Sequence, residues 1–118
     1  NYTVSNIEAT AAWMIDLFGW NNGGGAQQDF GAIDPRWNRK SLLALYQEQT
    51  SQPQKEISYH TIRGLNHIAV VVEDIQIMRQ RVQDAGFTPG EHYDYEPGQR
   101  FYFDDHDSIE YEVVQYDS

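Results

Sequence analysis

The stretch Val72-Glu73-Asp74-Ile75 begins an apolar helical segment that ends at Ala85-Gly86-Phe87. A similar pair of signals occurs earlier in the chain, where Val4-Ser5-Asn6-Ile7-Glu8 begins a segment that ends at Phe18-Gly19-Trp20. The offset is 68 residues at the start and 67 at the end, which is more than half of the 118-residue chain. An internal repeat of this size predicts two copies of one supersecondary unit, packed against each other with a ligand pocket between them.

The composition is typical of a globular protein, because 40% of the residues are hydrophobic and 22% are charged. No apolar run approaches the roughly 20 residues that span a bilayer, so we expect no membrane partner. The lack of cysteine excludes disulfides and thiolate chemistry and fits a cytoplasmic protein. The net charge of -10 disfavours nucleic acid, because phosphate backbones are bound by arrays of basic side chains. It suits a neutral, cationic or metal-bridged ligand.

The first half contains one clear helix. Residues 5–8 have the spacing of a capping box, with Asn6 as a competing cap, and apolar residues recur at helical intervals until Gly19 ends the helix. The other expected elements are the end of a strand at 1–4, a flexible loop at 21–25, a short strand at 30–33, a turn at 34–38 and a more apolar strand at 41–47. The polar stretch 48–58 around Pro53 predicts a linker between the halves.

The second half has the order strand, helix and three strands. A strand rich in β-branched residues is expected at 65–72, and Asp74 then caps a helix that runs to about Ala85. The remaining elements are an edge strand at 91–95, strands at 99–104 and 109–116, and a tight turn between them at 105–108. We therefore expect a single domain with module one at about 1–48, a linker at about 49–62 and module two at about 63–118.

Three stretches of the second half carry a family resemblance. Residues 64–74 (GLNHIAVVVED) place a His at the start of a strand that runs into an Asp-capped helix, residues 100–107 (RFYFDDHD) join an aromatic strand to an acidic turn, and residues 109–116 (IEYEVVQY) form a final strand containing Glu112. With the helix signals of the first half, these stretches resemble the glyoxalase/bleomycin-resistance/extradiol-dioxygenase superfamily, also called vicinal oxygen chelate proteins.

The resemblance implies an α+β fold in which two tandem βαβββ modules form a curled mixed sheet, or cup, with the helices on its outer face. It also implies a ligand in the cup, and in the enzymes of the superfamily one divalent metal held by up to four side chains, two from each half. Because members of the superfamily commonly form dimers, we expect a homodimer.

Strand alternation places His67 on one face of its strand and Glu112 on the same face as Glu110 in the last strand. If those strands are neighbours, as the resemblance implies, His67 and Glu112 face one cavity. A neutral imidazole and a carboxylate form a partial ligand set for zinc, iron, manganese or nickel. The alternative is a hydrogen-bonded structural His and a solvated Glu.

The metal ligands that the resemblance implies in the first half do not appear in the sequence. Counting back from Asn6 places one of them just ahead of Asn1. The other falls near Ala44 or Leu45, where no carboxylate or imidazole occurs, and Gln47 or Glu48 would serve only after a slip in register. Two protein ligands are few for a catalytic metal site.

Four further residues are candidates for ligand binding. Arg100 and Tyr102 alternate onto one face of a middle strand and are suited to a polar or acidic ligand group, although an ion pair and a packed aromatic are the simpler interpretation. His60, in the linker, is a candidate for the pocket mouth or for proton transfer, against a solvated loop His. Trp37, in a predicted turn, is a candidate for stacking on a ligand or for an interface.

The function that these observations favour is a small-molecule-binding protein of the glyoxalase/bleomycin-resistance type. An acidic, aromatic-lined cup is suited to cationic ligands through stacking and cation–π contacts. The alternative is a metal-dependent lyase, isomerase or dioxygenase that uses His67 and Glu112 as part of a divalent-metal site. A third hypothesis is an interaction domain whose cup takes no ligand.

Overall fold

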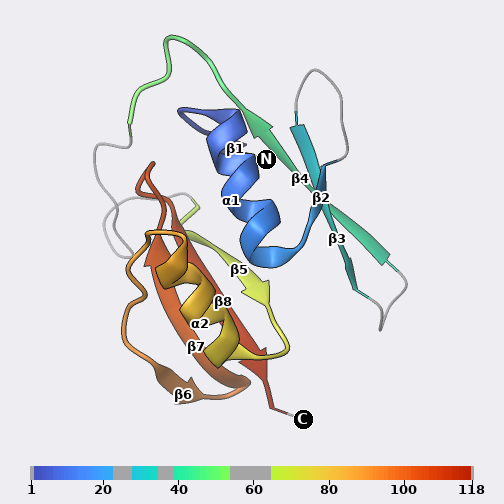
Figure 1. Ribbon diagram of the computed structural model, residues 1–118, viewed down its shortest axis with the longest axis vertical. Helices are drawn as coiled ribbons and strands as arrows, with labels where there is room; N and C mark the ends of the chain where they lie inside the picture. The colour runs from blue at the N-terminus through green and yellow to red at the C-terminus, as the bar shows by residue number, and fades with distance from the viewer. Residues whose placement is uncertain (1, 23–27, 35–38, 54–64, 118) are drawn as a thin grey trace. The chain divides into compact units, whose positions relative to one another are not determined.

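The computed structural model describes residues 2–22, 28–34, 39–53 and 65–117, and it divides into two compact units, 1–52 and 53–118 (Figure 1). The elements of the first unit are β1 (Tyr2–Thr3), α1 (Ile7–Phe18), β2 (Asn21–Asn22), β3 (Gln28–Asp34) and β4 (Arg39–Tyr46). Those of the second unit are β5 (His67–Val71), α2 (Ile75–Asp84), β6 (Tyr93–Tyr95), β7 (Gly98–Asp104) and β8 (Glu110–Tyr116). The fold is therefore of the mixed α+β class.

Each unit contains a four-stranded sheet, within the described residues, and the two sheets share one strand order. The order is β1-β4-β3-β2 in the first unit and β5-β8-β7-β6 in the second. In both sheets the first strand pairs in parallel with the last strand of its unit, and the other pairings are antiparallel. The parallel pairing brings the strand that precedes each helix next to the strand that ends the unit.

The first residue of the helix in each unit donates a hydrogen bond to a glutamine side chain at an equivalent position. The backbone N–H of Ile7 donates to the side-chain oxygen of Gln47 at 2.7 Å, and that of Ile75 donates to the side-chain oxygen of Gln115 at 2.8 Å. Both members of the second pair lie 68 residues after their counterparts, which is the offset found in the sequence. Each glutamine satisfies one of the backbone donors that a helix leaves free at its N-terminus.

The side-chain caps decide where the helices begin. Asn6, rather than Ser5, is the N-cap of α1 and accepts a hydrogen bond from the backbone N–H of Ala9 at 3.0 Å. Asp74 caps α2 and accepts from the backbone N–H groups of Gln76 and Ile77. A carboxylate or amide oxygen at this position stabilises a helix by about 1 kcal/mol.

Glycine ends both helices. Gly19 is the C-cap of α1 and has a φ of 69°, which is a left-handed conformation that side chains disfavour. The second helix closes at Ala85, and the next residue, Gly86, takes the left-handed conformation with a φ of 94°. The same device therefore acts one residue later in the second unit.

The core of the second unit lies between α2 and one face of its sheet. The helix packs against β7 and β8 (Figure 1). The buried side chains that α2 contributes are Ile75, Met78 and Val82, and those of the strands are Phe101, Phe103, Tyr111 and Val113. Burying an aliphatic or aromatic side chain of this size stabilises a fold by about 1.5–3 kcal/mol.

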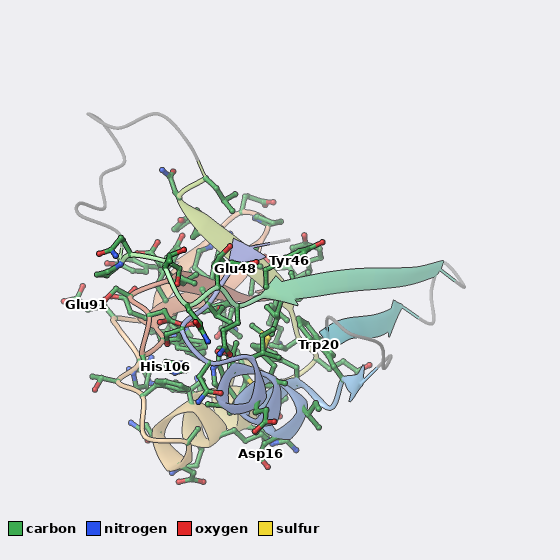
Figure 2. The ribbon with its side chains drawn as sticks, turned by 90° about the horizontal axis from the view of Figure 1, so that it is seen from above. Asp16, Trp20, Tyr46, Glu48, Glu91 and His106 are labelled. Carbon is green, nitrogen blue, oxygen red and sulfur yellow. The ribbon has the colours of Figure 1, made fainter. Side chains whose placement is uncertain are left out.

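The apolar side of α1 is likewise buried, with Met14 and Leu17 at 0% exposure. Asp16 points outward from this helix (Figure 2). The structure describes no helix that is long and apolar enough to cross a membrane.

Where the predicted elements fall on described residues, they agree with the observed ones apart from their ends and one short strand. Of the turn expected at 34–38, Asp34 belongs to β3 and the rest lies outside the described residues, as does the linker from residue 54. Strand β3 is longer than expected, because its polar residues Gln28 and Asp29 pair with β4. The first two residues of the loop expected at 21–25 form instead the strand β2, which pairs with β3, and residues 23–25 lie outside the described residues. The turn after β7 forms as expected, with the backbone N–H of Ser108 donating to the carbonyl oxygen of Asp105 at 3.0 Å. The predicted module boundaries stay predictions.

Candidate functional site

One face of the second sheet carries a group of polar and aromatic side chains. Residues paired across neighbouring strands point to the same side of a sheet, and the register aligns His67 with Glu110, Tyr102 with Glu112, and Tyr93 with Arg100. Phe101 and Tyr111 alternate onto the opposite face, where α2 packs. We call the first side the polar face; it consists of His67, Tyr93, Tyr95, Arg100, Tyr102, Asp104, Glu110 and Glu112.

A chain of three charged or polar side chains crosses the polar face. The Nε2 atom of His67 lies 3.0 Å from Oε2 of Glu112, and the other oxygen of Glu112 accepts a hydrogen bond from Arg100 at 2.8 Å. Glu112 and Arg100 are 8% and 7% exposed, so this ion pair is buried. The carboxylate is therefore held at both of its oxygens, by groups from the two strands that flank β8.

Arg100 is engaged on several sides. Its NH2 group donates to the backbone carbonyl oxygens of Tyr95, Glu96 and Gly98 at 3.1, 3.2 and 3.4 Å. Its guanidinium carbon lies 4.0 Å from the centre of the Tyr95 ring, which is a cation–π contact. Burial acts to lower the pKa of Arg100, but its interactions with Tyr95 and Glu112 outweigh burial and raise that pKa. Arg100 thus stays cationic and ties β6 and β8 to β7.

A second carboxylate lies near His67. Oε1 of Glu110 is 3.8 Å from Nδ1 of His67, on the opposite side of the ring from Glu112. Asp104 pairs with Glu110 across the strands, and desolvation together with the charge of Glu110 raises the pKa of Asp104. This end of the polar face is therefore strongly negative, and a positive group placed there would be stabilised.

Tyr102 is a neutral aromatic wall beside His67. The two rings meet edge to face, with centroids 5.7 Å apart, and the Tyr93 ring lies 6.3 Å from that of Tyr102. Burial, followed by a hydrogen bond with Tyr95 and the charge of Glu112, raises the pKa of Tyr102 to about 12. The hydroxyl of Tyr102 therefore keeps its proton at neutral pH.

A pocket of about 410 Å³ opens beside this network. Its lining residues are Gly90, Glu91, Tyr93, Tyr95, Tyr102 and Glu110. Within the described part of the chain, three tyrosines and two glutamates form its wall, and none of these lining side chains is a cation. Glu91 lies at the outer edge of the unit (Figure 2).

The described residues do not complete a metal site. They contain no group of three His, Cys, Asp or Glu side chains placed to hold a metal ion. His67 and Glu112 would supply two ligands, but a catalytic zinc site takes three protein ligands and an open position. Glu112 also has one oxygen occupied by Arg100.

The resemblance points to a first-half ligand near the end of β4, where the structure describes Leu45, Gln47 and Glu48. Leu45 is buried and apolar, and the side-chain oxygen of Gln47 is occupied by the backbone of Ile7. Glu48 is exposed after β4 (Figure 2).

Of the predicted site residues, the structure brings four together. His67, Glu112, Arg100 and Tyr102 share the polar face, whereas Trp37 and His60 lie outside the described residues. Arg100 is engaged mainly by Glu112 and by backbone carbonyls. The sequence interpretation missed Tyr93, Tyr95 and Glu110 as pocket residues. The alternation of exposed aromatic residues in 91–95 was the available signal for the first two.

Comparison with solved structures finds this fold in small-molecule resistance proteins and in domains related to them. The fosfomycin resistance protein FosX from Mesorhizobium loti is 21% identical, with a TM-score of 0.72 over 98% of this chain and 87% of that one. A glyoxylase/bleomycin resistance protein/dioxygenase domain from Frankia sp. EAN1pec is 18% identical, with a TM-score of 0.71 over 99% of this chain and 88% of that one.

FosX from Listeria monocytogenes, in a complex with Mn(II) and a sulfate ion, is 16% identical, with a TM-score of 0.73 over 99% of this chain and 88% of that one. A mutant of the same protein was solved with Mn(II) and 1S,2S-dihydroxypropylphosphonic acid. No family model matches the chain, and no curated protein sequence matches it. At these identities the structural likeness shows a shared fold.

Proposed function

We propose, from the premise that the chain has the vicinal oxygen chelate fold, that it is a small-molecule-binding protein of the glyoxalase/bleomycin-resistance type. The ligand lies against the polar face of the second sheet, in the pocket beside His67, Glu112 and Arg100. In this proposal the two units belong to one domain, as the sequence predicts.

The observation that carries the proposal is the pocket bordered by a buried, charge-paired network. Its volume of about 410 Å³ lies in the range of small-molecule sites, which are mostly 300–1,000 Å³. Such sites combine aromatic walls with a few fixed polar groups. Here Tyr93, Tyr95 and Tyr102 supply the walls, and Glu110 supplies a carboxylate.

The network fixes the pocket before a ligand arrives. Arg100 holds Glu112, and Glu112 holds the Nε2 side of the His67 ring. The edge of that ring in turn meets Tyr102, which lines the pocket. Side chains that are already ordered lose little conformational entropy on binding, so such a site binds more tightly than a flexible one.

The fold relatives support a small ligand but not a particular one. FosX from Listeria monocytogenes was solved with Mn(II) and a phosphonate. The described lining of the pocket contains two glutamates and no cation, and Arg100 is already paired with Glu112. A phosphonate would therefore be repelled by the carboxylates of this pocket, so we propose that the ligand of the pocket belongs to another chemical class.

The test is a thermal-shift screen of cationic, neutral and anionic small molecules. We expect hits whose stabilisation is lost in Tyr93→Leu, because Tyr93 is 43% exposed and can change without a core cavity. Ile77→Ala is the matched control, since Ile77 is 52% exposed on α2, away from the polar face. Hits that respond equally to both variants, or no hits at all, would contradict the proposal.

One observation favours the alternative, a metal-dependent lyase, isomerase or dioxygenase. The 3.0 Å between Nε2 of His67 and Oε2 of Glu112 is close to the spacing of two ligands that share one ion at about 2.1 Å from each. His67 and Glu112 would hold the ion, and a divalent metal would supply Lewis-acid polarisation of substrate oxygens. The remaining ligands would come from outside the described residues.

Metal content and metal-dependent thermal shift distinguish the two functions. The binding proposal predicts less than one divalent ion per chain after purification, and the same small shift with manganese in the wild type and in His67→Ala. A stoichiometric ion that His67→Ala loses would instead favour the metal-dependent alternative.

A further inference from the structure

We infer that the ligand of this pocket carries a positive, alkylated ammonium group, held by the rings of Tyr93 and Tyr102 between the carboxylates of Glu91 and Glu110. This inference deepens the proposed function and rests on it. It concerns the part of the pocket formed by β6, the segment before it and the ends of β7 and β8.

The first argument is charge. Glu91 and Glu110 are the carboxylates of the lining, and among the described residues no lysine or arginine joins them there. The chain as a whole has a net charge of -10, so the surrounding field has the same sign. A pocket walled by one sign of charge concentrates ions of the opposite sign.

The second argument is aromatic geometry. Tyr93 and Tyr102 stand at 70° to each other with centroids 6.3 Å apart, so the two rings form a corner. A cation gains from the faces of aromatic rings when it lies within about 6 Å of a centroid. Recognition of quaternary ammonium groups by several aromatic rings is an established use of this interaction.

One aromatic ring of the pocket wall already forms a cation–π contact within the chain. The guanidinium of Arg100 lies 4.0 Å from the centre of the Tyr95 ring. Tyr95 also lines the pocket, although Arg100 does not. The ring of Tyr95 is thus already used by a cation of the chain, which leaves Tyr93 and Tyr102 for the ligand.

The protonation of the lining fits a cationic ligand. Burial in the first place raises the pKa of Tyr102 to about 12, so its ring stays a neutral phenol at physiological pH. The hydroxyl of Tyr93 lies 3.5 Å from Oε2 of Glu91, which places that carboxylate at the rim of the aromatic corner. The ligand's ammonium group therefore meets aromatic rings and the carboxylates of Glu91 and Glu110.

The experiment compares choline with its uncharged carbon isostere, dimethylbutanol, by calorimetric titration into the full chain. The two probes have the same shape, so a difference in affinity reports the charge. We expect choline to bind at least about fivefold more tightly than the isostere. We also expect its affinity to fall with added salt.

Four variants locate the effect. Glu110→Gln and Tyr93→Leu should each weaken choline binding by about fivefold or more. Glu73→Gln, which removes an exposed carboxylate between β5 and α2, should leave it unchanged. The unfolding midpoint of each variant shows that it is folded, and Glu91→Gln provides a second carboxylate test at an exposed position.

Equal affinity for choline and its isostere would overturn the inference, as would choline binding that survives both Glu110→Gln and Glu91→Gln. The proposed function is judged separately by the thermal-shift screen. If neutral or anionic compounds bind, Tyr93→Leu abolishes their binding and choline does not bind, then the cationic ligand is contradicted and the proposed binding function is supported. If the screen gives no hits and choline does not bind, both the proposed function and the cationic ligand are contradicted.

Discussion

The Nε2 atom of His67 lies 3.0 Å from the Oε2 atom of Glu112, although the two residues are 45 positions apart in the chain. The parallel pairing of β5 with β8 brings them together, and Arg100 from β7 holds the far oxygen of the same carboxylate at 2.8 Å.

Glu112→Gln should destabilise the protein strongly. The substitution keeps the shape of the side chain but leaves Arg100, which is 7% exposed, without its counter-charge. Breaking a buried ion pair by removing one partner costs about 3 kcal/mol or more. Urea unfolding measures the loss. Glu110→Gln is the matched control and should cost less than about 1 kcal/mol, because its contact with His67 is 3.8 Å long. Equal losses in the two variants would contradict the network.

Gly98→Ala should be far more harmful than Gly90→Ala. A Cβ added at Gly98 would collide with the backbone carbonyl of Gln115 in the neighbouring strand, whereas one at Gly90 would meet the carbonyl oxygen of Tyr102 at 3.1 Å. Forcing β7 away from β8 would disturb Arg100, and overpacking costs about 1–3 kcal/mol or more. We expect Gly90→Ala to cost less than about 1 kcal/mol. Thermal unfolding measures the stability of the two variants. A greater loss of stability in Gly90→Ala than in Gly98→Ala would contradict the prediction.

Gln47→Ala and Gln115→Ala should cost similar amounts, about 1 kcal/mol each. Each side chain accepts from the first backbone N–H of a helix, at 2.7 and 2.8 Å. Gln76→Ala, an exposed position on α2, is the control and should stay within about 0.5 kcal/mol of the wild type. Chemical denaturation supplies the three values. If only one of the two glutamine variants loses stability, the hydrogen bond at the helix N-terminus stabilises only one of the two units.

Stability should fall at alkaline pH through Tyr102. Burial, chiefly, raises its pKa from 10.0 to about 12 in the folded chain. Because the folded state holds this proton more tightly, the contribution to stability is fully present below about pH 10 and is lost as the pH rises toward about 12. Unfolding free energies measured across that range should decline less steeply in Tyr102→Phe. Tyr116→Phe, at an exposed position in β8, should follow the wild type. A Tyr102→Phe profile that matches the wild type would contradict the assignment.

Much of the fold can be predicted because short-range signals decide it. Asp74 is a strong helix cap, and the apolar positions Ile75, Met78 and Val82 follow it at helical intervals, as the structure has them. The choice of Asn6 over Ser5 as the first cap could not be made from spacing alone, since both are good caps. Likewise, the polar residues at the start of β3 join a strand only because β4 pairs with them.

The site could be predicted only in part. Alternation and the family resemblance place His67 and Glu112 on one face, and the structure brings them within hydrogen-bond distance. The burial of Arg100 depends on long-range pairing and on the backbone carbonyls of Tyr95, Glu96 and Gly98, which no sequence pattern reveals. The pocket depends in turn on the register that aligns Tyr93 with Arg100. Trp37 and His60 stay predictions.

The most direct test of the central claim is amide chemical-shift mapping of the chain with the strongest ligand from the screen. We expect the amide signals that shift on ligand addition to be concentrated at Gly90, in β6 and β7, and around Glu110. In Tyr93→Leu, the same addition of ligand should leave these signals at their ligand-free chemical shifts. Changes centred on α2 and the face of the sheet that it covers would contradict a ligand site on the polar face.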